Sequence, residues 1–133
     1  MVVAWFAVQE SWRLALLAYL YLAVCGLPSD DERIQRCVTQ IVQVVSTVKK
    51  REASEISVPL FVQYLMVGIC ARNEKDRKIA RTKLSNVVET KFWPVRGVGF
   101  VPVLDDLWHG AGANGHPVTW NDYLRSREAL LPT

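Results

Sequence analysis

The stretch SDDERIQRCVTQIVQVVSTVKKR, residues 29–51, decides the fold class of this chain. Ser29 and Glu32 have the spacing of a capping box, in which each side chain bonds a backbone N–H at the start of a helix. Behind this cap, apolar residues return every three or four positions: Ile34, Val38, Ile41, Val45 and Val48. The stretch predicts a helix with one apolar side. That side covers only about two heptads, so we expect it to face a core rather than a coiled-coil partner.

A second apolar pattern fills residues 4–24 and stops at Gly26 and Pro28. We expect the core face of this first helix to consist of Trp5, Val8, Trp12, Leu16, Tyr19 and Ala23. The uninterrupted apolar run covers only residues 14–25, which is short of the roughly 20 residues that span a bilayer. We therefore expect a core helix, with a partner-binding or membrane-associated helix at residues 4–24 as the alternatives.

The remaining chain also carries helix signals. Further helices are expected from Pro59 to about residue 71, from Asn73 to Pro94, over residues 101–108, and from Thr119 to about residue 130. Asp76 and Asp122 lie three residues after their proposed caps, as in a capping box. Because no alternating strand pattern is present, the sequence predicts an all-α protein without a sheet. About six helices should pack as helical hairpins in a single domain, residues 1–133.

The composition is that of an ordinary globular protein. Of the 133 residues 50% are hydrophobic and 22% charged, which excludes wholesale disorder, and the net charge of +3 does not by itself predict nucleic-acid binding. The three cysteines, Cys25, Cys37 and Cys70, are too widely spaced for a zinc site. We expect them to be buried, reduced thiols of an intracellular protein.

No set of residues predicts an enzyme, a cofactor site or a metal site. The segment GAGANG at 110–115 has the glycine spacing of a dinucleotide fingerprint, but no strand is expected before it, so the match is accidental. Asp105 and His109, with His116 nearby, offer too few ligands for a metal. We expect Asp105 and His109 to form a pair that steadies the end of their helix.

Two further clusters allow more than one interpretation. Six cations between residues 72 and 83 predict a solvated helix face, with a phosphate-contacting or nuclear-import patch as the alternative. Around the glycine loop, aromatic and imidazole side chains gather that could line a small-molecule or peptide pocket, or plug the last helical hairpin: Trp108, His109, Trp120 and Tyr123. We favour the plug and keep these four residues as candidate ligand or partner contacts.

Several short motifs resemble one known family. They are VPLF at 58–61, Gly68, Asp76-Arg77, VLDDLWHG at 103–110, PVTWNDYLRSR at 117–127 and LLP at 130–132. Together they resemble the C-terminal part of the fungal-specific transcription factor regulatory domain, which follows the zinc cluster in Zn₂Cys₆ regulators. The resemblance covers residues 58–132.

This resemblance implies a nuclear protein in transcriptional control that binds protein partners or a small-molecule effector. The family's DNA-binding module needs six clustered cysteines, and three dispersed ones cannot form it. We therefore expect no direct DNA binding by this chain alone, and an incomplete regulatory domain or fragment. A homodimer through the apolar first helix, a cytoplasmic location and a generic helical interaction scaffold remain as alternatives.

Overall fold

The computed structural model describes residues 2–51, 60–85 and 97–130, and the side chains of residues 6–46, 60–85 and 99–130. These residues form six α-helices and three short helical turns, with no strand among them. The elements are α1 (Val2–Tyr19), η1 (Leu20–Val24), α2 (Glu32–Arg51), α3 (Phe61–Cys70), α4 (Glu74–Ser85), η2 (Gly97–Phe100), α5 (Val101–His109), η3 (Ala113–Gly115) and α6 (Trp120–Leu130). The predicted all-α class with six helices is confirmed. The predicted start at Pro59 and the predicted end of the fourth helix at Pro94 lie outside the described residues.

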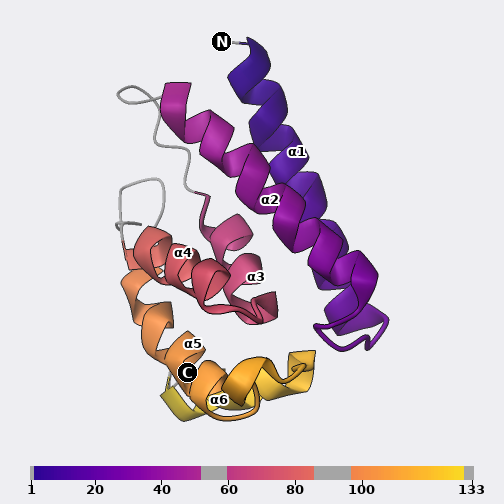
Figure 1. Cartoon of the computed structure of the whole chain (residues 1–133), viewed down its shortest axis with the longest axis vertical. Helices are drawn as coiled ribbons and strands as arrows, with labels where there is room; N and C mark the ends of the chain where they lie inside the picture. The colour runs from indigo at the N-terminus through magenta and orange to yellow at the C-terminus, as the bar shows by residue number, and fades with distance from the viewer. Residues whose placement is uncertain (1, 52–59, 86–96, 131–133) are drawn as a thin grey trace.

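The helices pack in successive pairs. The long α1 and α2 lie side by side, α3 packs on α4, and α5 packs on α6 (Figure 1). Buried apolar side chains from all six helices meet in one core, and α3 contacts both α1 and α2. This arrangement confirms the predicted helical hairpins.

The buried face of α1 only partly matches the predicted one. Val8 is buried and Trp12 and Ala23 are half-buried, while the side chain of Trp5 lies outside the described residues. Leu16 and Tyr19, expected in the core, are 51% and 38% exposed. The side facing the core consists of Val8, Ser11, Leu14, Ala15, Ala18 and Leu22. α1 is apolar on nearly all sides, so spacing alone does not select a face. Small side chains decide it, since Ser11, Ala15 and Ala18 let α1 approach its neighbours closely.

The apolar side of α2 is confirmed, but its cap is not the predicted one. Ile34, Val38, Ile41 and Val45 are buried, while the side chain of Val48 lies outside the described residues. Asp31, not Ser29, begins the helix, because its carboxylate accepts the Arg33 N–H at 2.9 Å. This bond and the Arg33 guanidinium lower the pKa of Asp31, with the side-chain contact to Arg33 the larger cause.

Ser29 instead joins two segments that are far apart in the sequence. Its hydroxyl accepts the N–H of Val118 at 2.8 Å, and its own N–H donates to the Val118 carbonyl at 2.8 Å. Both residues are buried. This two-bond contact, the Ser29–Val118 clasp, fixes the segment before α6 to the turn between α1 and α2.

The other local signals act as predicted. Gly26 adopts a left-handed φ of +70° after η1, and Asn73 caps α4 by accepting the Asp76 N–H at 2.8 Å. At α6, the Asp122 carboxylate accepts the Thr119 N–H at 2.8 Å, and the Thr119 hydroxyl accepts the Asp122 N–H at 3.3 Å. These caps need only residues three positions apart, so sequence spacing is sufficient to identify them.

The cysteines divide in their exposure. Cys37 and Cys70 are buried as predicted, whereas Cys25 is exposed after the last turn of η1. The prediction of a buried Cys25 was wrong because the apolar run that contains it ends at the surface.

Candidate functional site

The four predicted contact residues fall into two separate groups. Trp108 and His109 line a cavity of about 340 Å³ beside the glycine loop. Trp120 and Tyr123 pack against each other with tilted rings, centroids 5.0 Å apart, and Trp120 makes a T-shaped contact with Tyr19 of α1 at 5.3 Å. Tyr123 is buried, which raises the pKa of its hydroxyl. The second group therefore joins α6 to the first helix, whereas the plug interpretation placed these rings within the last helical hairpin.

Trp108 is held in a fixed position beneath the cavity. Its indole N–H donates to the Gly68 carbonyl at 2.8 Å, and the side chain is buried. A Cβ at Gly68 would lie 2.6 Å from Leu104 Cδ1, so a larger residue there would force the Leu104 side chain to shift. This close approach of α3 and α5 brings the indole within reach of the Gly68 carbonyl.

Asp105 and His109 do not form the predicted side-chain pair. The Asp105 carboxylate instead makes an ion pair with Arg81 of α4. The His109 ring bonds the backbone carbonyl of Asp105 through Nδ1 at 2.7 Å. A carbonyl can only accept a hydrogen bond, so Nδ1 carries the proton. Both contacts still steady the end of α5, but through different partners from those predicted.

The glycine loop is a structural connection and not a nucleotide fingerprint. It follows the helix α5, and the Gly112 N–H bonds the Leu107 carbonyl at 2.8 Å. Gly115 has a φ of +78°, and a Cβ there would lie 2.7 Å from the Arg72 carbonyl oxygen. The loop thus needs glycine at 115 to rest on the turn between α3 and α4.

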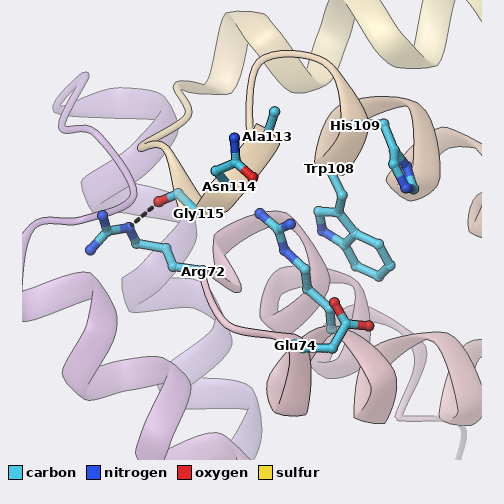
Figure 2. Close-up of a pocket in the computed structure, with 8 residues that line it drawn as sticks. Arg72, Glu74, Trp108, His109, Ala113, Asn114 and Gly115 are labelled. Atoms are coloured by element: carbon cyan, nitrogen blue, oxygen red, sulfur yellow. Dashed lines mark hydrogen bonds between the residues drawn. The ribbon is translucent and has the colours of Figure 1, made fainter.

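Two arginines hold this loop in place. Arg72 Nε donates to the Gly115 carbonyl at 2.9 Å, the bond drawn as a dashed line in Figure 2. Arg77 Nη2 donates to the Gly112 carbonyl at 2.7 Å, and its Nε donates to the Ala71 carbonyl at 3.3 Å. Both arginines line the cavity. The other side chains around it include Glu74, Trp108, His109 and Asn114.

The basic stretch has a structural role that its sequence does not predict. Arg72, Lys75 and Lys78 are exposed, as a solvated face requires, but Arg77 is buried and Arg81 is ion-paired with Asp105 of α5. Arg77 and Arg81 also lie over the Trp108 ring, with guanidinium carbons 5.6 and 5.4 Å from its centroid. The available signal was the Asp76-Arg77 motif, which served only for the family resemblance.

Within the described parts of the chain, no group of three His, Cys, Asp or Glu side chains is placed to hold a metal ion. None of the helices described combines the length and apolar character needed to cross a membrane.

Comparison with known families bears on the whole chain. The model of the fungal specific transcription factor domain matches residues 3–132. This chain belongs to that family. The match also covers α1 and α2, which lie outside the 58–132 range of the resemblance seen in the motifs. Comparisons with curated proteins and with solved structures gave no match.

This fungal transcription factor domain has a second notable surface, on the outer side of its first helix. Large apolar side chains are exposed there along α1 and η1: Phe6 at 63%, Leu16, Tyr19, Leu20, and Val24 at 67%. We call these five residues the α1 apolar strip.

Proposed function

We propose that this chain is a regulatory domain in transcriptional control, which acts by binding and not by catalysis. The observation that carries the proposal is the family match over residues 3–132. It favours a role in transcription over a generic helical scaffold. Membership of a transcription factor family also supports a nuclear location.

In this proposal the chain does not read DNA itself. A zinc cluster of the Zn₂Cys₆ type needs six neighbouring cysteines, whereas this chain has three. Cys37 and Cys70 are also buried in the core, where they support packing and not metal binding. DNA contact would therefore come from residues or proteins outside this sequence.

We propose that another protein of the transcription apparatus binds this domain at the α1 apolar strip. Leu16 and Leu20 lie four residues apart on one side of the helix and are both about half exposed. Removing such surface from water favours association. The partner we propose is another protein with an apolar surface, and a homodimer would be recognised by sedimentation of the purified chain.

A tethering experiment tests the regulatory role. Residues 1–133 are fused to an unrelated DNA-binding domain, and expression of a reporter with the matching site is measured. We expect the fusion to change expression relative to the DNA-binding domain alone. The double variant Leu16→Gln, Leu20→Gln should lose most of this effect, while Gln9→Ala on the same helix should keep it.

Two results would contradict this proposal. One is a fusion that leaves reporter expression unchanged although it is folded, nuclear and present at normal levels. The other is tight binding of the isolated chain to a specific duplex, with affinity falling steeply as salt increases.

A further inference from the structure

The cavity beside the glycine loop contains a buried positive charge, Arg77, with Glu74 nearby but no carboxylate at ion-pair distance among the described residues. Arg77 is only 9% exposed, and the groups that accept its hydrogen bonds are the neutral carbonyls of Ala71 and Gly112. A guanidinium group has five N–H donors, so donors remain after these bonds are made. Burial lowers the pKa of Arg77, which reflects the cost of holding this charge away from water.

A second hollow rich in arginine differs in that its arginines are paired with carboxylates. Arg13, Arg33 and Arg36 line a cavity of about 130 Å³ between α1 and α2. Each of these arginines makes an ion pair with a carboxylate, to Glu10, Asp31 and Glu32 respectively. Charge there is balanced within the protein. At Arg77 no carboxylate lies within ion-pair distance among the described residues.

The surroundings of Arg77 also suit a small anionic ligand. Arg72 is exposed at the edge of the cavity and uses its Nε to hold Gly115, which leaves its terminal nitrogens available. Figure 2 shows Asn114 and Trp108 bordering the same space, with Glu74 at its rim. A volume of about 340 Å³ is within the range of small-molecule sites.

We propose that this cavity binds a small oxyanion, a carboxylate or phosphate group of a metabolite, between Arg77 and Arg72. Guanidinium groups match such oxyanions in charge and in planar, two-point geometry. Asn114 can donate a further hydrogen bond from its amide. Under the proposed regulatory function, on which this role rests, the bound anion would be the effector that reports a metabolic state.

The ligand would also stabilise a specific part of the fold. Arg72 and Arg77 both hold the glycine loop, and the loop leads directly to Val118 of the Ser29–Val118 clasp. An anion shared by the two arginines would strengthen this attachment. We therefore expect amide exchange in residues 110–118 to slow on binding.

The test uses the full chain and two probes, inorganic phosphate and succinate. Nitrogen-15 NMR resolves the arginine Nε–H and Trp indole signals, so binding is followed at Arg72, Arg77 and Trp108. We expect saturable shifts at these three groups with at least one probe. The probe that binds more tightly separates phosphate from carboxylate as the favoured group.

Charge variants at the rim test the site without removing the buried arginine. Arg72→Gln should weaken binding about tenfold, because a charge-assisted contact is lost. Glu74→Gln should tighten it about two- to threefold, because a like charge near the anion is removed. Arg33→Gln, in the other arginine-lined hollow, is the matched control and should change nothing.

Misfolding cannot make one variant bind the anion more weakly and the other more tightly. The Arg72 and Glu74 variants therefore stay informative even where Arg77→Lys fails to fold. The proposal is overturned if neither probe gives saturable shifts, or if Arg33→Gln weakens binding as much as Arg72→Gln. Failure here would leave the proposed regulatory function intact, since the reporter experiment does not depend on an anion. Conversely, binding without a reporter effect would contradict only the regulatory function.

Discussion

At the scale of single residues, Gln63 is the polar group that the core accommodates least well. Its side chain is fully buried, its Nε2 donates to Ser11 Oγ at 3.1 Å, and its Oε1 has no hydrogen-bond partner among the described residues. Ser11 in turn donates to the Val8 carbonyl at 2.7 Å. A buried acceptor without a donor costs free energy, so the native side chain is not the most stable choice at this position.

Replacing Gln63 by methionine should therefore stabilise the protein. Gln63→Met removes the unsatisfied oxygen at similar volume, and we expect the free energy of unfolding to rise by about 1 kcal/mol. Ser11→Ala should do the opposite, because it leaves Gln63 Nε2 without its acceptor. Urea denaturation measures both. A Gln63→Met variant less stable than the native chain would show that the hydrogen bond to Ser11 outweighs the orphaned oxygen.

The three thiols should differ sharply in reactivity. Burial raises the pKa of Cys70 to about 12 and also raises that of Cys37, with desolvation the first cause for both. Since the thiolate is the reactive form, we expect an exposed-thiol reagent to label Cys25 alone in the folded chain. Mass spectrometry should find one label on the native protein and three after denaturation.

The same shifts predict a pH dependence of stability. A Cys70 thiol in the unfolded chain ionises near its ordinary pKa of 9.0, whereas the folded chain resists ionisation until about 12. The folded state therefore binds more protons between these values, and the free energy of unfolding should fall as pH rises above about 9. A Cys70→Ala variant should show a shallower fall, measured as the slope of unfolding free energy against pH.

At the scale of elements, the start of α4 depends on one side chain. Asn73 accepts the Asp76 N–H and also donates to the Asp76 carboxylate at 3.1 Å. Asn73→Ala should lower the free energy of unfolding by about 1 kcal/mol, as for other helix caps, and Asn73→Ser should restore most of it. The matched control is Asn121→Ala, at an exposed position inside the first turn of α6. Equal effects at the two asparagines would contradict the capping role.

What could be predicted from sequence follows the range of each interaction. The α2 core side and the caps at Asn73 and Thr119 depend on residues a few positions apart, and all were identified. The face of α1 was not, because an almost wholly apolar helix leaves the choice to its packing partners. Ser29 was assigned to a local cap, although its hydroxyl bonds a residue 89 positions away.

The candidate site was harder still to predict. Trp108 and His109, two of the predicted contact residues, line the cavity, but a run of cations is normally solvated, so nothing local marked Arg77 as buried. Its position depends on the carbonyls of Ala71 and Gly112, which belong to two different connections of the fold. Such a site exists only after the helices have assembled.

At the scale of the whole molecule, the Ser29–Val118 clasp carries a prediction that separates it from a local cap. Ser29→Ala leaves the buried Val118 N–H without an acceptor, and we expect a loss of about 1 to 3 kcal/mol in unfolding free energy. Hydrogen exchange should quicken at the Val118 amide. Ser46→Ala, which removes an exposed hydroxyl from α2, is the control. Faster exchange confined to the first turn of α2 would instead support the capping box.

The clasp also sets an order of events during synthesis. Its two halves are 89 residues apart, so at about 5 to 20 residues per second Val118 leaves the ribosome roughly 4 to 18 seconds after Ser29. The α1–α2 hairpin, whose contacts are local in the chain, can fold within that time. Until the α5–α6 connection has been synthesised, the polar groups of Ser29 form hydrogen bonds with water. Closure of the clasp is therefore a late step of folding. It can occur only after the nascent chain has been synthesised at least as far as Val118.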